Sequence, residues 1–411
     1  MESFLRAEFP LVFEHLTFTK INDLAYLFFW EGTDPALKPG LLTAHFDVVP
    51  ADGALWTRPP FDGAIEDDFL YGRGTLDTKC TLLGILEAAE LLLAEGFAPR
   101  RSWYFAFGGD EELIGNRGAG EISRYLEEQN ITCEFALDEG TVVADGLIEG
   151  INRPIALLGI SEKGYASIQL TVSGKGGHAS SPPDTSTIGI LADAIGALET
   201  KQSPPRLTDA VDRFLQSLAP HSRGLRRPAY RHPALFAPLI KKIMTGAPAT
   251  AALVRTTRAA TMIKGSEKDN VMPTSAEAVF NTRILPGDTV ESTLEEFKKT
   301  IADPRVELAL FKPETAHDPI PESPLTGEAY KKLEETVQSV FPEAVPAPFL
   351  SIVTTDSRYY RNITDCIFRL SPLKLTQEEI ARIHGIDERI SFDNIDRVIT
   401  FYKKLITTFS S

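Results

Sequence analysis

The chain has 411 residues, of which 43% are hydrophobic and 24% are charged, and its formal net charge at pH 7 is −15. This length exceeds the ~250–300 residues at which a single core stops growing, so we expect two domains. The acidic balance disfavours binding to phosphate backbones and to anionic lipid surfaces. We therefore expect neither a nucleic-acid partner nor a membrane partner.

The sequence predicts no membrane span and no disulfide framework. The first ten residues include Glu2, Arg6 and Glu8, which argues against a signal peptide there, and no later run reaches the ~18 apolar residues of a transmembrane helix. The three cysteines are too few and too scattered for a disulfide framework. A cytoplasmic location is the simplest expectation.

The first part of the chain alternates predicted strands and helices. Short apolar runs at residues 41–46, 103–107 and 134–137 predict buried strands, and residues 80–94 predict a helix. This order is typical of an α/β fold with a mainly parallel, doubly wound sheet that carries helices on both faces.

The pattern changes near residue 163. Residues 165–172 alternate polar and apolar side chains, as a strand with one solvated face does, and residues 276–285 form a second such strand. We therefore predict a smaller α+β domain, for a lid or for dimerisation, at 163–312. It is inserted into a catalytic domain made of residues 1–162 and 313–411. The catalytic domain is expected to resume with helices at 328–340 and 394–409 and a strand at 349–353.

Side chains of the types that bind metals follow each of the three N-terminal strands. They are His45 and Asp47, then Asp110, Glu111 and Glu112, then Asp138 and Glu139. Ligands of open α/β sheets bind at the carboxyl ends of the strands, so these groups are expected to converge on one crevice. Asp77 lies in a glycine-containing loop before the predicted helix at 80–94, where helix-terminal N–H groups can hold a carboxylate.

Several carboxylates in one crevice would repel each other and take up protons unless a cation neutralised them. A single acidic residue is usually a solvated surface charge, and a lone histidine usually has an ordinary polar partner. Four clusters at four element ends instead favour a bound metal. Imidazole and carboxylate ligands without thiolate suit catalytic Zn²⁺, with Co²⁺ or Mn²⁺ as substitutes.

The ordered motifs also resemble those of a two-zinc metallopeptidase family that includes aminoacylase, carboxypeptidase S, glutamate carboxypeptidase and succinyl-diaminopimelate desuccinylase. The motifs are HFDVVP at 45–50, GRGTLDTK at 72–79, DEE at 110–112, LDEG at 137–140 and GGHAS at 176–180. Within the family, HASSPP at 178–183 and IHGIDER at 383–389 are most similar to the carboxypeptidase S and N-fatty-acyl-amino-acid hydrolase branch.

The resemblance implies two zinc ions per chain and a set of residues that bind them. His45 corresponds to a ligand of one ion, Glu112 and His384 to ligands of the other, and Asp77 to the carboxylate that bridges them. The remaining ligand is either Asp138 or Glu139, and the sequence does not decide between them.

The resemblance also implies roles around the metals. Glu111 corresponds to the general base, and Asp47 to a carboxylate that orients His45. Because Asp47 stands two residues after His45, both would point to the same face of a regular strand. His178 is implied to reach across a homodimer interface, formed by the inserted domain, and to polarise the scissile carbonyl in the partner's site.

Further residues correspond to the substrate side of the site. Asn270 and Arg283 match positions that hold the substrate carboxylate, and Thr355, Asp356 and Arg358 resemble a second substrate-side motif. Taken alone, an arginine on a strand is often an ordinary exposed residue, so these assignments depend on the resemblance.

We therefore expect zinc-dependent hydrolysis of an amide bond next to a free carboxylate, by a metal-activated water with Glu111 as general base. The substrate would be a small peptide or an N-acyl amino acid, and the sequence does not separate the two. One alternative is an aminopeptidase-type exopeptidase on the same site, which Arg283 and Asn270 disfavour. Another is a catalytically silent binding dimer, which the intact Glu111 disfavours.

Overall fold

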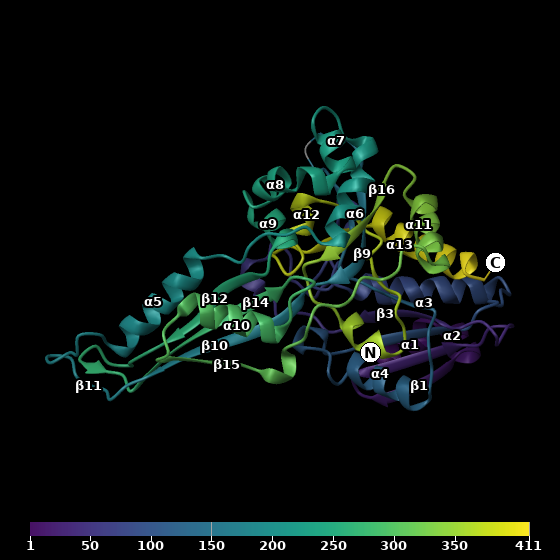
Figure 1. Cartoon of the computed structure of the whole chain (residues 1–411). Helices are drawn as coiled ribbons and strands as arrows, with labels where there is room; N and C mark the ends of the chain where they lie inside the picture. The colour runs from purple at the N-terminus through teal and green to yellow at the C-terminus, as the bar shows by residue number, and fades with distance from the viewer. Residues whose placement is uncertain (149, 411) are drawn as a thin grey trace.

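The computed structural model describes residues 1–148 and 150–410, and a large sheet forms its centre (Figure 1). The strand order is β1-β2-β6-β3-β7-β17-β9-β8-β18, and β16 pairs with β9. The strands are β1 Thr17–Asn22, β2 Ala25–Trp30, β3 Gly40–His45, β6 Trp103–Gly108, β7 Phe135–Asp138, β8 Val143–Asp145, β9 Ile155–Glu162, β16 Val345–Ser351, β17 Ile367–Arg369 and β18 Lys374–Thr376. β3 pairs in parallel with β6 and β7, and β7 with β17, whereas β1, β2 and β6 form an antiparallel edge.

Helices cover both faces of this sheet because its strands are apolar on both sides. Leu41 packs into one core with α4 (Ala119–Glu128), whereas its neighbour Leu42 packs into the other core with α3 (Lys79–Ala94) and α13 (Phe392–Thr408). Helices α1 (Glu2–Glu8), α2 (Pro10–His15) and α11 (Glu328–Val340) also contribute to the α3 side. Such all-apolar strands are typical of a sheet buried between two helical layers. The predicted α/β class with a mainly parallel central sheet is confirmed.

A second, smaller sheet forms an arm that extends to the left in Figure 1. Its antiparallel order is β12-β14-β10-β15. The strands are β10 Gly164–Ser173, β12 Thr257–Lys264, β14 Ser275–Ile284 and β15 Val306–Leu310, and helices α5 Thr187–Thr200 and α10 Val290–Ile301 pack on one face. Ile168 and Leu170 enter that core, while Gln169 between them stays partly exposed, as the alternating pattern predicts.

Four helices between the two halves of this arm pack on the large domain instead. They are α6 Asp209–Leu218, α7 Arg226–Arg231, α8 Pro233–Met244 and α9 Pro248–Val254. Phe214 of α6 meets Phe349 of β16, with ring centroids 5.3 Å apart, and belongs to the core of the large sheet. The predicted insertion at 163–312 therefore contains segments that belong to two cores, and its boundaries stay a prediction.

Strand β16 begins earlier than the predicted strand at 349–353. Pro346 and Pro348 made its first half an unpromising strand, because proline cannot donate a ladder hydrogen bond. β16 pairs with β9 alone among the strands that the structure describes, so it is an edge strand and tolerates both prolines. Of the described helices, none is long and apolar enough to cross a bilayer.

Candidate active site

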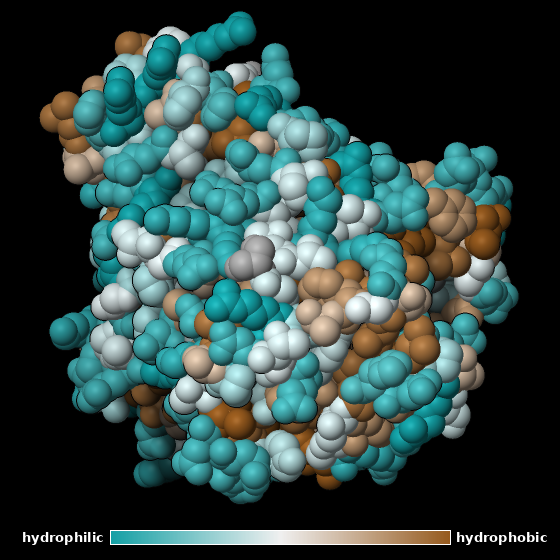
Figure 2. Space-filling view, turned by 90° about the vertical axis from the view of Figure 1, so that its right-hand side faces the viewer, coloured by the Kyte–Doolittle hydropathy of each residue, from teal (hydrophilic) through white to brown (hydrophobic). Residues whose placement is uncertain are grey.

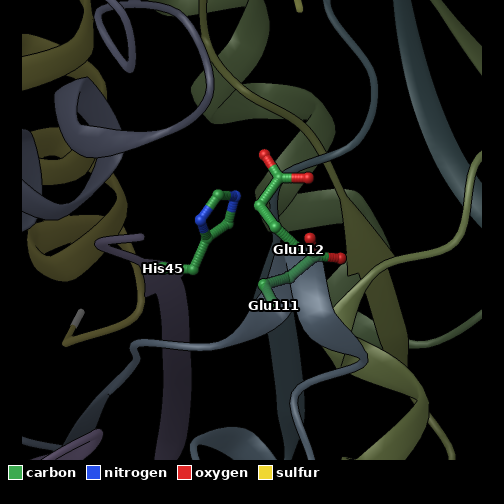
Figure 3. Close-up of side chains that lie close together, drawn as sticks. All are labelled: His45, Glu111 and Glu112. Atoms are coloured by element: carbon green, nitrogen blue, oxygen red, sulfur yellow. The ribbon is translucent and has the colours of Figure 1, made fainter. Parts of the chain in front are cut away.

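The carboxyl ends of parallel strands bring the predicted ligands together. His45 is the last residue of β3, Glu111 and Glu112 lie in the short helix η2 (Glu111–Leu113) after β6, and Glu139 follows β7. Figure 3 shows the His45 ring opposite the side chains of Glu111 and Glu112, and ligand atoms of these three residues lie within 4.8 Å of one another. The crevice expected from the strand order is therefore present.

Asp77 lies between two imidazoles. Its Oδ1 is 2.9 Å from Nε2 of His45, and its Oδ2 is 2.8 Å from Nε2 of His384. The same nitrogen of His384 lies 3.1 Å from Oε1 of Glu112. Each oxygen of Asp77 thus faces a different histidine, which is the arrangement that a carboxylate shared between two cations requires.

Two groups of candidate ligands share this carboxylate. His45, Asp77 and Glu139 form one, and Asp77, Glu112 and His384 form the other; in each, the ligand atoms lie within 4.8 Å of one another. The donor set of imidazoles and carboxylates fits two divalent cations of the zinc type.

The sequence left the choice between Asp138 and Glu139 open, and their surroundings differ. The carboxylate of Asp138 accepts hydrogen bonds from the backbone N–H groups of Glu139 (2.9 Å) and Ser357 (2.7 Å). Glu139 instead turns into the ligand group with His45 and Asp77. We therefore propose Glu139 as the ligand and Asp138 as an anchor for the backbone around it.

Burial and mutual repulsion shape the protonation of the site. Burial raises the pKa of the Glu111 carboxyl, and the nearby charge of Asp356 adds to this. Burial lowers the pKa of His45, but its hydrogen bonds with Asp47 and Asp77 outweigh that effect and raise it. Hydrogen bonds with Asp77 and Glu112 raise the pKa of His384 to about 10. Protons on the two imidazoles therefore compete with cations, and cation binding should release them.

A buried ion pair between Glu388 and Arg73 holds the loops of Asp77 and His384. Glu388 accepts hydrogen bonds from the backbone N–H groups of Leu76 (2.7 Å) and Asp77 (3.2 Å), and Arg73 donates to its other oxygen at 2.6 Å. Arg73 also donates to the backbone carbonyl of His384 at 3.2 Å. Both residues belong to motifs visible in the sequence, but their pairing across the chain was not.

A cavity of about 1630 Å³ opens beside the metal-ligand candidates. At one end it is lined by Asp77, Glu111, Glu112, Glu139 and His384, and beyond them by apolar side chains, many of them from α6 to α9. Arg283 of β14 also lines it, donating to Oγ1 of Thr354 at 2.7 Å and standing 4.9 Å above the Tyr165 ring. His317, whose ring stacks on that of Tyr165, is on the same wall.

The second predicted substrate motif contributes differently from expectation. Arg358 lines the cavity and donates to the backbone carbonyls of Thr355 (2.9 Å) and Ile114. Thr355 is fully buried, because its side chain caps the short helix η5 (Asp356–Asn362) and donates to Glu162 at 3.2 Å. Its neighbour Thr354 faces the cavity, so we propose Thr354 in place of Thr355 on the substrate side.

Tyr165 and His317 were missed because no motif marks them, and Thr354 was passed over for its neighbour Thr355 in the second substrate-side motif. Tyr165 was recognised only as a strand residue, and His317 stands apart from the other ligand-type residues. They meet Arg283 because β10 pairs with β14 and because residue 317 bridges to Tyr165. Asp356, predicted beside them, is buried, and this burial raises the pKa of its carboxyl to about 7.

His178 and Asn270 lie far from this cavity in one chain. His178 ends β11 (Gly177–His178), which pairs with β13 (Val271–Met272) at the tip of the arm in Figure 1. Both residues are exposed, and the backbone carbonyl of Asn270 accepts from Ala179 at 3.1 Å. A single chain therefore does not bring them to the candidate metal centre.

Comparison with known proteins gives a consistent assignment. Residues 41–408 match the model of peptidase family M20/M25/M40. The chain is 40% identical over 407 residues to the probable carboxypeptidase S-like 2 of Dictyostelium discoideum, covering 98% of this chain and 78% of that protein. It is 42% identical over 390 residues to the human N-fatty-acyl-amino acid synthase/hydrolase PM20D1, covering 94% and 77%.

The fold is similar to that of the M20 family metallo-carboxypeptidase Sso-CP2 from Sulfolobus solfataricus, with a TM-score of 0.72 at 17% identity and coverage of 99% of this chain and 93% of that one. The family match and the two relatives confirm the resemblance seen in the motifs, including its branch. The chain belongs to peptidase family M20/M25/M40 and is a metallo-hydrolase.

Proposed function

We propose that this enzyme hydrolyses the amide bond of N-acyl amino acids that carry a long apolar acyl chain. The cavity is the observation that supports this most directly: it begins at Glu111 and Glu112 and continues between apolar side chains such as Phe214, Ile240 and Leu253. Burial of each methylene group contributes about 0.8 kcal/mol, so such a wall favours a hydrocarbon chain over a polar peptide. The relative named as an N-fatty-acyl-amino acid hydrolase supports the same substrate class.

Arg283 is the candidate partner of the substrate carboxylate. Its guanidinium is held by Thr354 and Tyr165 on the cavity wall, and a planar fork of N–H donors matches the two oxygens of a carboxylate. Recognition of a free carboxylate would separate this enzyme from an aminopeptidase, which must bind a free amine.

We further propose two divalent cations, Zn²⁺ with Co²⁺ or Mn²⁺ as substitutes, held by the two ligand groups that share Asp77. The cations would polarise the amide carbonyl and the attacking water. Glu111 lies outside the two groups that share Asp77, although its carboxylate is also close to His45 and Glu112, and burial raises the pKa of its carboxyl. Glu111 can therefore take the proton of the water and pass it to the leaving nitrogen. Asp47 and Asp138 hold the backbone around these groups.

The proposal includes a homodimer in which His178 and Asn270 of one chain complete the site of the other. Its support is the position of both residues at the exposed tip of the arm. Strand β12 is an edge of the small sheet among the described strands, and its Met262 and Ile263 are exposed. Edge strands with exposed apolar side chains are ready to pair with another chain.

A series of N-acyl amino acids of increasing chain length tests this function. With the amino acid held constant, kcat/KM should rise about fourfold per added methylene until the cavity is filled, since 0.8 kcal/mol corresponds to that factor. Replacing Leu253 with Ser should flatten the rise and spare short chains. A preference for dipeptides or for N-acetyl amino acids over long chains would contradict the proposal and favour a peptidase.

A further inference from the structure

The charge of the chain is unevenly distributed. No Asp or Glu occurs between Asp212 and Glu267, although the chain as a whole carries a net charge of −15. Helices α7 and α8 and the residues that join them to their neighbours fall inside this stretch. Their basic side chains are Arg223, Arg226, Arg227, Arg231, Lys241 and Lys242, and all but Lys241 are exposed. This part of the surface is therefore positive on an acidic protein.

Large apolar side chains are exposed on α8 and immediately before α7. The exposed fraction is 88% for Leu225, 75% for Leu235, 52% for Leu239 and 67% for Ile243. Leu235, Leu239 and Ile243 follow each other at four-residue spacing, so they form one stripe along α8. The uppermost lobe in Figure 2, which carries α7, shows apolar side chains on its outside next to hydrophilic ones. Contiguous exposed apolar side chains of this kind mark an interaction surface.

The stripe is continuous with the cavity. Leu239 and Ile243 line the cavity, as does Leu225 before α7, whereas Leu235 lies beyond its wall. An apolar path therefore leads from the outer end of α8 to the carboxylates of Glu111 and Glu112. A hydrocarbon chain that followed this path would stay against apolar side chains for its whole length.

We infer that α7 and α8 dock the enzyme on an anionic lipid surface, from which an acyl chain can pass along the stripe into the cavity. Exposed leucines insert at the boundary of head groups and acyl chains, and neighbouring basic side chains bind anionic head groups. A second copy that docked through this same face would bring the same positive charge and be repelled. The docking does not depend on the proposed substrate, whereas the passage of an acyl chain rests on the proposed function.

The inference departs from the expectation, drawn from the net charge, that the protein has no membrane partner. The expectation of no membrane contact treated the charge of −15 as uniform. Electrostatic attraction decays within about 8 Å at physiological ionic strength, so a lipid surface responds to the local charge of α7 and α8.

Sedimentation with lipid vesicles tests the inference directly. Wild-type protein should sediment with vesicles of phosphatidylcholine and phosphatidylglycerol, stay in solution with phosphatidylcholine alone, and be released as salt is added. Leu235→Asp, and the double variant Arg227→Glu with Lys242→Glu, should each weaken binding about tenfold or more. Leu55→Asp and Lys331→Glu, which place an acidic residue at an exposed apolar and an exposed basic position elsewhere, should each bind like wild type.

The outcomes separate the alternatives. Wild-type protein that ignores anionic vesicles, or variants of α7 and α8 that bind as tightly as wild type, would overturn the inference. A change of oligomeric state in Leu235→Asp with unchanged vesicle binding would identify the surface as a contact between copies and overturn it too. Unchanged melting temperatures show that the variants are folded. Because vesicle binding is measured without a substrate, docking and the proposed hydrolysis can fail independently.

Discussion

The carboxylate of Asp47 accepts a hydrogen bond from the backbone N–H of Glu111 at 3.2 Å. Its second oxygen accepts from the N–H of Glu112 at 3.1 Å, and its first oxygen also lies 3.3 Å from Nδ1 of His45. The Asp47 side chain thus contacts the proposed base Glu111, the proposed ligand Glu112 and the buried imidazole of His45. Asp47 can therefore affect metal binding and activity without contacting the substrate.

Replacing Asp47 with Ala should therefore lower metal affinity and activity together. Loss of a partner that orients a metal-binding histidine typically costs ~10–100-fold in metal affinity or activity. Zinc titration with a competing chelator, alongside kcat at saturating zinc, measures both. Asp62→Ala, which changes an exposed aspartate, serves as the control. Wild-type zinc affinity in Asp47→Ala would show that His45 and the two glutamates hold their positions without it.

The adjacent glutamates are expected to respond in opposite ways. Glu111→Gln should retain metal and lose nearly all turnover, because an amide cannot accept the proton of the water; general-base catalysis is worth ~10²–10⁴-fold. Glu112→Gln should lose affinity for one of two metal ions, because its carboxylate is in the group with Asp77 and His384. Metal content by elemental analysis and kcat distinguish them. If Glu111→Gln lost metal and Glu112→Gln kept it, Glu111 would be the ligand and Glu112 the general base.

Much of this site could be predicted because its ligands follow strands whose apolar character is evident in the sequence. His45 ends the buried strand β3, Glu112 lies in η2 shortly after the buried strand β6, and the order of parallel strands brings their ends to one edge. The helix at 328–340 was also predicted at its observed bounds, since its apolar residues recur at helical spacing.

The remainder depends on contacts between segments that are distant along the chain. The pairing of Arg73 with Glu388, and the meeting of Tyr165 with His317, have no local signal. Likewise, α6 to α9 lie within the predicted insertion, but buried side chains of α6, α8 and α9 belong to the core of the large sheet, which helical spacing alone does not reveal. The apolar cavity results from that packing, so the sequence left peptides and N-acyl amino acids unresolved.

Lys163 is expected to make stability depend on pH. It is 1% exposed, its Nζ donates to the carbonyls of Ala252 (3.0 Å) and Arg255 (2.8 Å), and burial, with the charge of Arg283, lowers its pKa to about 7. An unfolded lysine has a pKa of ~10.4, so the unfolded chain binds more protons between pH 7 and 10.4. The free energy of unfolding should then rise with pH in that window, by up to ~1.4 kcal/mol per unit from this residue.

Urea unfolding of wild type and Lys163→Met at pH 7, 8, 9 and 10 measures this contribution. The free energy of unfolding of wild type, minus that of Lys163→Met, should increase as the pH rises. Lys331→Met, at an exposed lysine, should follow wild type throughout. Parallel pH profiles for wild type and Lys163→Met would mean that this lysine keeps an ordinary pKa in the folded protein.

The proposed dimer predicts complementation between two inactive chains. His178→Ala and Glu111→Gln should each be inactive alone, because each lacks one part of every composite site. After subunit exchange, a heterodimer contains one site with His178 and Glu111 both intact, so about a quarter of wild-type activity should return, given that half of the dimers are mixed and one of their two sites works. Exchange is monitored with differently tagged chains. Mixed dimers without activity would rule out a role for His178 across the interface.

The most direct test of the central claim compares one long-chain N-acyl amino acid with its C-terminal amide, in wild type and in Arg283→Ala, with and without a chelator. Truncating one member of a buried charged pair costs ~2–5 kcal/mol, or about thirtyfold or more in kcat/KM. Wild type should prefer the free acid by at least that factor and lose activity when metal is removed, and Arg283→Ala should lose most of the preference. Equal rates on acid and amide, or activity that survives metal removal, would contradict a metal-dependent amidohydrolase that recognises a free carboxylate.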